Sequence, residues 1–246
     1  YFSIGKGWGN LLSYPYFPDQ TGGSHAFAGG ATIGGKYAPL DLSMIGEDHR
    51  YAFYKNAPAG SVKPMQMASL QPIGWDEYKR EKEKEDGKYS WTKAPRYGEH
   101  VMEVGPAARV VNTYLSGSNP RINQMVDSLN RDLGIGLGDS PSVRGRHLSR
   151  FIGAAETIAR LRESLDRVEA GKSAFIEKAV PANASGQGLT EATRGALGHW
   201  IETDSKGYIR NYEMIVPTTW NISPRDENGR HGAVEKMLIG TRVADA

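Results

Sequence analysis

The chain has 246 residues, and its 30 Lys and Arg against 28 Asp and Glu give a net charge of +2 at pH 7. Such a nearly neutral balance of charges argues against a protein that binds nucleic acid or an anionic membrane surface. Cysteine is absent, which excludes disulfides, a thiol nucleophile and any metal bound by thiolates of this chain alone. No apolar run reaches the roughly eighteen residues of a membrane-spanning helix.

The two ends of the chain carry no signal of a natural terminus. It opens with Tyr1 in place of Met, shows no signal-peptide pattern, and stops at Ala246 without a recognisable tail. We therefore expect residues 1–246 to be a single piece of a longer protein.

Residues 1–100 are rich in turn-forming residues and predict short strands joined by loops. Paired glycines at 29–30 and 34–35 interrupt the first stretch. No G-x-G-x-x-G or Walker sequence occurs, so a phosphate-binding loop is not indicated. The run 76–88 mixes both signs of charge, which is typical of a helix or an excursion at the surface.

Residues 101–172 predict a helical core. Start and stop signals of proline, asparagine and glycine indicate three helices, over residues 106–116, 119–133 and 141–170. Apolar side chains recur at helical spacing in each, so each helix is expected to bury one face. On the third helix this face holds Leu148, Phe151, Ile152, Ala155, Ile158, Ala159, Leu165 and Val168.

Residues 173–246 predict mainly strands. The stretch 175–180 looks extended, and 208–216 alternates apolar and polar residues until Pro217 stops it. A short helix is expected over 232–239. The fold class is therefore α+β, with a mainly helical central core and strands or hairpins around it.

Generic catalytic motifs are absent. The six histidines include no H-E-x-x-H or similar pair, so a helical zinc site is not supported. There is no G-x-S-x-G nucleophile elbow. These generic motifs therefore indicate no particular function for the chain.

Three local strings are more specific, and they occur in residues 88–109 (KYSWTKAPRY followed by MEVGPAAR), 188–200 (GLTEATRGALGHW) and 211–226 (NY, then VPTTWN and SPRD). Their order and spacing resemble the large subunit of nickel–iron hydrogenases, and the opening GWGNLLSY of residues 7–14 also looks like that subunit. The resemblance covers essentially the whole chain. The KAPRY string is similar to the corresponding string in the respiratory, H₂-uptake branch of this family.

The resemblance implies a bimetallic centre and a hydrogenase large-subunit fold. In this family nickel is held by four thiolates from two C-x-x-C pairs, and two of them bridge to an iron that carries carbon monoxide and cyanides. The family splits H₂ heterolytically, passes electrons to iron–sulfur clusters of a small subunit and releases protons along carboxylates. A peripheral location in the periplasm or on the outer face of the cytoplasmic membrane is also implied.

Several residues of this chain match functional positions of the family. Arg194 matches the arginine that overhangs the open coordination position and donates to a cyanide, and Thr218 matches the hydroxyl donor to the other cyanide. Leu197 matches an apolar residue beside the iron ligands. Thr193, in place of the family's proline, and Pro217 flank these positions and are expected at the same cofactor site. A guanidinium stays charged, so Arg194 is expected to act as a fixed cation.

The departures from the family concern the metal ligands. Both C-x-x-C pairs are missing, and we expect them before Tyr1 and beyond Ala246, together with the proton-transfer glutamate and a metal-binding histidine. Met214 falls near the position whose backbone carbonyl serves a magnesium ion. The remaining cysteine-bearing segments of the subunit would therefore be partners of this chain.

Two alternatives stay open from the sequence. The chain could be a cysteine-free, metal-free relative with a structural or assembly role, and Arg194 could be an ordinary buried arginine paired with Glu191. If the hydrogenase reading holds, Arg194 and Thr218 should meet at one concave spot, with an apolar face left for the small subunit. Structural roles are expected for Trp220, an Arg225–Asp226 ion pair, Lys93 and Arg96, whereas His199 is either a core histidine or a polar group close to the site.

Overall fold

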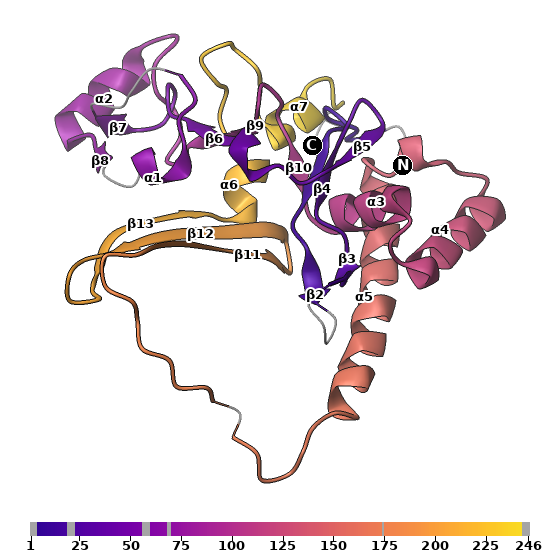
Figure 1. Cartoon of the computed structure of the whole chain (residues 1–246). Coiled ribbons are helices and arrows are strands. Elements are labelled where there is room, and N and C mark those ends of the chain that lie inside the picture. Colours follow the sequence, from indigo (N-terminus) through magenta and orange to yellow (C-terminus); the bar gives the residue numbers. More distant parts are fainter. Residues whose placement is uncertain (1–3, 19–22, 56–59, 68–69, 174, 243–246) are drawn as a thin grey trace.

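The computed structural model describes residues 4–18, 23–55, 60–67, 70–173 and 175–242, so the extreme residues Tyr1 and Ala246 lie outside it. Helices and strands are mixed, as predicted (Figure 1). The helices are α1 (Pro64–Met67), α2 (Trp75–Glu83), α3 (Pro106–Ser116), α4 (Pro120–Leu133), α5 (Val143–Leu165), α6 (Pro217–Asn221) and α7 (Ala233–Leu238). The predicted helices at 106–116, 119–133 and 232–239 are confirmed within a residue or two at each end.

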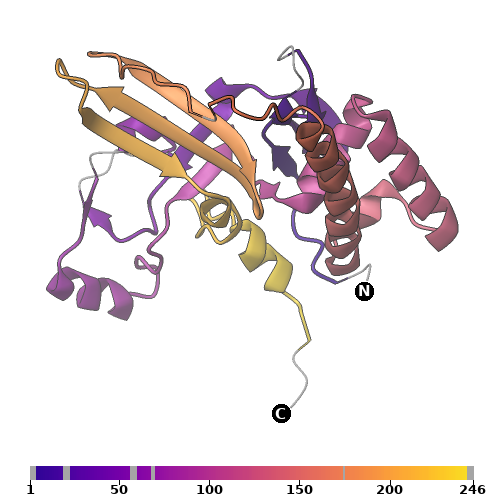
Figure 2. The same cartoon turned by 90° about the horizontal axis from the view of Figure 1, so that it is seen from below.

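The strands form two sheets and three two-stranded ribbons. One sheet has the order β10-β1-β4-β5, the other β11-β12-β13, and the ribbons are β2-β3, β6-β9 and β7-β8. The strands are β1 (Leu11–Ser13), β2 (Tyr16–Pro18), β3 (His25–Phe27), β4 (Gly30–Ile33), β5 (Lys36–Pro39), β6 (Ile45–Asp48), β7 (Tyr54–Lys55), β8 (Gln71–Pro72), β9 (Ala94–Tyr97), β10 (Glu103–Val104), β11 (Ser185–Ala192), β12 (Gly195–Thr203) and β13 (Ile209–Ile215). The β11-β12-β13 sheet and α5 lie on opposite sides of the four-stranded sheet (Figures 1 and 2).

Helix α3 is the central element of the fold. Pro106 occupies its first turn and Gly117 ends it in the left-handed conformation, as the sequence signals indicate. It packs on β1 and on α5. Its Asn112 is fully buried and joins three strand positions, because its side chain accepts from the Thr32 hydroxyl (2.6 Å) and donates to the Ser13 hydroxyl (2.9 Å) and the Gly30 carbonyl (2.8 Å).

Helices α4 and α5 are capped by side chains that the sequence places at their starts. The Asn119 side chain accepts from the first amides of α4, and the Ser142 hydroxyl accepts from the Gly145 amide of α5. Ile122 and Val126 of α4 pack with Ile152 of α5 in one apolar cluster. A second cluster, built around Tyr14, Met102, Ile215 and Trp220, lies where the two sheets meet.

Two predictions about the later part of the chain are wrong, and two of its strands were not predicted individually. Residues 175–180 form no strand, because no neighbouring described strand pairs with them, and Phe175 and Ile176 are exposed. Helix α5 ends at Leu165 and not at 170, since no packing supports a longer helix. Strands β11 and β12 were not predicted, because glycines and charged residues weaken the alternation there.

The expected buried face of the third helix is also largely wrong for the described chain. Of the eight residues assigned to it, Ile152 is buried, whereas Phe151, Ile158, Leu165 and Val168 are between 63 and 73% exposed. The C-terminal end of α5 extends beyond α3 and α4 (Figure 1), and no described element covers the side of the helix that carries these exposed residues. Exposed apolar residues Phe151, Ile158, Leu161 and Leu165 follow the seven-residue spacing of a helix–helix seam and are called the α5 stripe below.

Replacing Asn112 by Ala tests the junction between α3 and the strands. The variant leaves the Ser13 and Thr32 hydroxyls and the Gly30 carbonyl without their partner in a dry interior, so we expect a loss of about 2–4 kcal/mol in the free energy of unfolding. Denaturant unfolding of the complete subunit measures it. Asn228→Ala, at an exposed side chain, is the control and should unfold like the parent; equal midpoints for both variants would contradict the role of Asn112.

Candidate functional site

One pocket brings together the two residues on which the hydrogenase resemblance chiefly depends. Its volume is about 320 Å³, and both Arg194 and Thr218 line it. The other lining residues come from β10, α3, α5, α6 and α7 and their flanks, and they are Glu103, Val104, Pro106, Ala107, Arg146, Arg150, Asn221, Ile222, Val234 and Met237. We call this the α3 pocket, because the N-terminal end of α3 forms one wall.

A close backbone contact places Arg194 over the α3 pocket. Thr193 and Arg194 form the turn between β11 and β12, since Ala192 pairs with Gly195. Gly195 (φ 131°) lies against Gly105 (φ 130°), so tightly that a Cβ on Gly195 would stand 2.6 Å from the Gly105 amide nitrogen. Only glycine tolerates both the positive φ and this approach. The turn is thereby fixed directly above the start of α3.

The Arg194 side chain is exposed and makes no hydrogen bond or ion pair within the described part of the chain. The alternative in which Arg194 pairs with Glu191 is wrong. Glu191 is buried and faces Arg109, whose Nε lies 3.3 Å from Glu191 Oε2, and the Tyr14 amide donates to the other oxygen at 2.8 Å. The guanidinium of Arg194 is therefore available to a group that enters the pocket.

Thr218 reaches the same pocket from the first turn of α6. Pro217, which was expected to end a strand and to lie at the cofactor site, is buried at the start of this helix. The side chain of Asn221 accepts from the Val104 amide and donates to the Val104 carbonyl, both at 3.0 Å, and so ties α6 to β10. The Thr218 side chain is exposed and has no hydrogen bond among the described residues.

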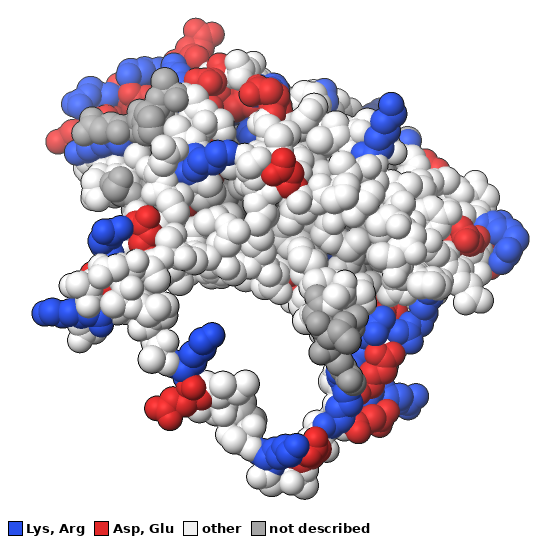
Figure 3. Space-filling view, in the orientation of Figure 1, with Lys and Arg blue, Asp and Glu red and all other residues white. Residues whose placement is uncertain are grey.

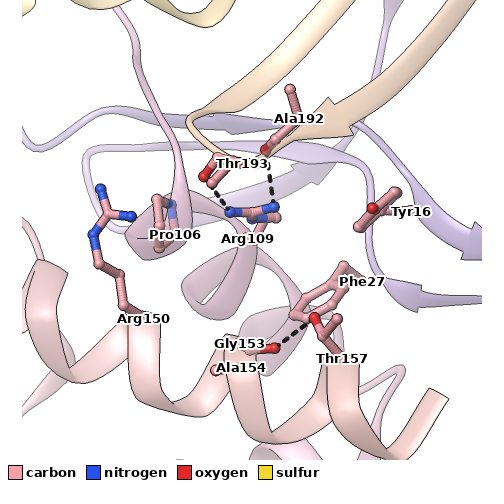
Figure 4. Close-up of a pocket in the computed structure, with 10 residues that line it drawn as sticks. All are labelled: Tyr16, Phe27, Pro106, Arg109, Arg150, Gly153, Ala154, Thr157, Ala192 and Thr193. Carbon is pink, nitrogen blue, oxygen red and sulfur yellow. Dashed lines mark hydrogen bonds between the residues drawn. The ribbon is translucent and has the colours of Figure 1, made fainter. Parts of the chain in front are cut away.

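A second pocket of about 250 Å³ adjoins the first across Pro106 and Arg150, which line both. Figure 4 shows Arg109 at its centre, donating to the carbonyls of Ala192 (3.1 Å) and Thr193 (3.2 Å). These bonds hold the β11–β12 turn from below. Thr193 lines this second pocket and not the α3 pocket.

The remaining residues expected at the cofactor site are not among those that line the α3 pocket. Leu197 lies on β12, half-buried and opposite Thr190. Pro217 is buried behind Thr218. Met214 pairs with His199 across β12 and β13 and is 48% exposed. Within the described ranges, no group of three or more His, Cys, Asp or Glu side chains could hold a metal ion.

Trp220, Arg96 and Asp226, which were expected to have structural roles, are buried, but Arg225 and Asp226 pair with other residues than predicted. Trp220 is fully buried. Arg96 is buried and paired with Asp226 at 2.8 Å, whereas Arg225 pairs with Asp86 at 3.1 Å, so the predicted Arg225–Asp226 ion pair is wrong. The Asp226 carboxylate turns inward and draws the 223–230 loop onto β9. No helix of the described chain is long and apolar enough to cross a membrane.

Lys93 lies between two buried carboxylates. Its Nζ is 3.1 Å from Glu47 Oε2 and 2.6 Å from Glu213 Oε2. Burial, with a smaller contribution from Glu213, raises the pKa of Glu47 to about 8 and outweighs the attraction of Lys93. The single Lys93 ammonium thus lies against the carboxyl groups of both Glu47 and Glu213, and Glu47 is the one that is protonated at neutral pH. Burial likewise raises the pKa of Glu191 to about 8 against the opposing effect of Arg109.

Replacing Gly195 by Ala tests the contact that fixes Arg194. The added Cβ meets the backbone of Gly105 in a conformation unfavourable for alanine, so we expect a destabilisation of about 1–3 kcal/mol or more. Thermal unfolding of the complete subunit measures it. Gly188→Ala, on the neighbouring strand β11 with open space around its Cα, is the control; an unchanged midpoint for Gly195→Ala would show that the turn is not held as described.

The raised pKa of Glu47 predicts a pH dependence of stability. A carboxyl protonated in the fold but ionised in the unfolded chain stabilises the fold less as pH rises, so the free energy of unfolding should fall between pH 4.5 and about 8 and then level. Glu47→Gln should reduce this slope and gain most relative to the parent near pH 8–9. Denaturant unfolding at a series of pH values measures it, with the exposed Glu169→Gln as control; parallel curves for parent and Glu47→Gln would contradict it.

Comparisons with known proteins point to one family. The family described as nickel-dependent hydrogenase matches residues 1–246. The chain is 31% identical to the periplasmic [NiFeSe] hydrogenase large subunit of Desulfomicrobium baculatum over 99% of this chain and 46% of that protein. It is 35% identical to the hydrogenase-1 large chain of Citrobacter freundii over 95% of this chain and 43% of that protein.

Solved structures show the same fold. The [NiFeSe] hydrogenase of Desulfomicrobium baculatum superimposes with a TM-score of 0.83 at 29% identity, over 99% of this chain and 48% of that one. The Ni-Fe-Se hydrogenase of D. vulgaris Hildenborough gives 0.81 at 31% identity, over 99% and 49%. The chain spans about half the length of these relatives. It belongs to the nickel-dependent hydrogenase family and has the fold of about half a hydrogenase large subunit.

Proposed function

We propose that this chain is part of the catalytic large subunit of a nickel–iron hydrogenase that oxidises H₂ to protons and electrons. The observation that carries the proposal is the pairing of Arg194 and Thr218 on one pocket, each with a donor that no described residue uses. Unused charged and hydroxyl donors in a pocket suit an anionic or acceptor-rich ligand. The match to the family over the whole chain supports the same reading.

The residues present fit the ligand side of such a centre. When bound, a nickel–iron centre with carbon monoxide and cyanide ligands would supply heterolytic cleavage of H₂. Arg194 would donate to one cyanide and hold a fixed positive charge over the open position, and Thr218 would donate to the other. The paired β11–β12 turn and the Asn221 bonds to β10 fix the backbone that carries each donor.

The metal ligands are proposed to come from segments outside this chain, because it has no cysteine. The two C-x-x-C pairs would be carried by the rest of the large subunit. Electrons would leave through iron–sulfur clusters of a small subunit. A magnesium ion near the carbonyl of Met214 and a peripheral periplasmic location remain parts of the proposal that rest on the family resemblance.

Uncovered apolar surface supports partners for this chain. The α5 stripe and the side chains of Phe175, Ile176 and Val180 are exposed in a chain whose charges otherwise gather around α2 and along α5. Between these charged regions the face in Figure 3 is largely free of Lys, Arg, Asp and Glu. We propose that the rest of the large subunit and the small subunit cover these surfaces.

Arg194→Lys tests the proposed role of the guanidinium. Lysine keeps the charge but loses the planar pair of donors, so H₂-dependent dye reduction by the assembled enzyme should fall on the order of 10²-fold while nickel content stays near that of the parent. Arg210→Lys, at an arginine of β13 that is exposed and paired with Glu202, is the control and should keep parental activity.

The same experiment separates the alternative function. A metal-free structural or assembly subunit would show neither nickel in the parent assembly nor any effect of Arg194→Lys on assembly. Nickel in the parent with full turnover in Arg194→Lys would remove Arg194 from the site but leave the hydrogenase assignment standing.

A further inference from the structure

Two arginines of α5 stand one turn apart beside the α3 pocket, and they differ in their partners. Arg146 is fully engaged: it binds Glu103 through two bonds (2.6 and 2.8 Å) and donates to the carbonyls of Gly5 (2.8 Å) and Pro141 (3.1 Å). Arg150 makes no hydrogen bond or ion pair with any described residue. Its side chain reaches from α5 toward Pro106, without a dashed bond in Figure 4.

Arg150 lies where the two pockets meet. It lines the α3 pocket with Arg194 and Thr218, and it lines the adjoining pocket with Arg109 and Thr193. Burial is the largest cause of the lowered pKa of the Arg109 guanidinium, and the positive charge of Arg150 lowers this pKa as well. The position therefore places a free guanidinium in the wall between the pockets.

The charge balance around these pockets is uneven. Arg109 is matched by Glu191 and Arg146 by Glu103. Arg150 and Arg194 have no such match among the described residues, which leaves two positive charges on the wall of the α3 pocket. The N-terminal end of α3 adds to them, because Gly105 provides no capping side chain and the amides at this end carry partial positive charge.

The other arginines of α5 either have partners or lie away from the two pockets. Arg160 binds Glu156 and Glu163 along the helix. Arg162, like Arg150, is exposed and has no partner among the described residues, but it lines neither of the two pockets. Arg150 alone combines a free guanidinium on this helix with a place on the α3 pocket.

We propose that Arg150 is a second anion-holding arginine of the site, which binds an anionic group between its guanidinium and the N-terminal end of α3. The inference rests on the proposed function. The anion is either part of the ligand set of the metal centre or a carboxylate from the rest of the large subunit. In both cases Arg150 is a positioning residue. It holds the anion beside Arg194, and the two arginines together neutralise the negative charge of the anion.

The test uses the assembled enzyme with Arg150→Gln and Arg150→Lys. Infrared spectroscopy of the cyanide stretching bands, nickel content and thermal unfolding are read together. If the anion belongs to the centre, Arg150→Gln shifts the cyanide bands with nickel retained. If the anion is a carboxylate of the subunit, the bands keep their positions and the unfolding temperature falls. Arg150→Lys, which keeps the charge, should restore most of either change.

Arg162→Gln removes an exposed arginine from the same helix and is the matched control. If Arg150→Gln behaves like Arg162→Gln in the bands, the nickel content and the unfolding temperature, the proposal is overturned. If Arg150→Gln fails to assemble, Arg150→Lys with parental bands and stability supports the need for a charge, whereas an equal failure of Arg150→Lys overturns it. Absence of nickel from the parent enzyme would instead contradict the proposed function itself.

Discussion

The contact between the backbones of Gly105 and Gly195 is the constraint on which the site depends. It brings the start of α3 and the β11–β12 turn, which lie far apart in the sequence, to a separation that no side chain allows. Arg109 of α3 then binds two carbonyls of that turn and, from below, the Glu191 carboxylate. The helix therefore positions Arg194 through backbone geometry, and Arg194 keeps its own side chain free.

The site is arranged so that structural charges are satisfied and the proposed functional charges are not. Glu191, Glu103 and Glu47 each have a basic neighbour, and the buried members of this set are protonated or paired. Satisfying these groups within the chain prevents them from competing for the guanidiniums at the pocket. The pairing of Glu191 with Arg109 illustrates this, because it leaves Arg194 available where a simple reading of the sequence would have joined Arg194 to its nearest acid.

Much of the fold could be predicted from local signals, and the failures have physical causes. Pro106, Asn119 and the terminal glycines placed α3 and α4 correctly, since caps act within one turn. Strands β11 and β12 were not predicted individually, because each is stabilised by pairing with a neighbouring strand and its own apolar and polar residues alternate only weakly. Pro217 was read as a stop, whereas its fixed φ suits the first turn of α6 equally well.

The site was predictable only in part. Arg194 and Thr218 were singled out by family motifs, and the structure places them on one pocket. Leu197, Pro217 and Met214 came from the same motifs but do not line that pocket. Arg150 was not singled out, because helical periodicity draws attention to the apolar face of α5, and an exposed charged residue outside that face carries no signal of its own. Its free guanidinium becomes visible only when the partners of its neighbours are known.

Helix α5 carries two features that the described residues leave without a partner, the α5 stripe and the charge of Arg150. Both lie on the same helix, so under the proposed function a segment that covers the stripe and an anion held by Arg150 meet on one element. Where docking of the segment favours binding of the anion, the anion strengthens that docking by the same free energy. Filling the pocket and completing the interior of the subunit are then linked binding equilibria.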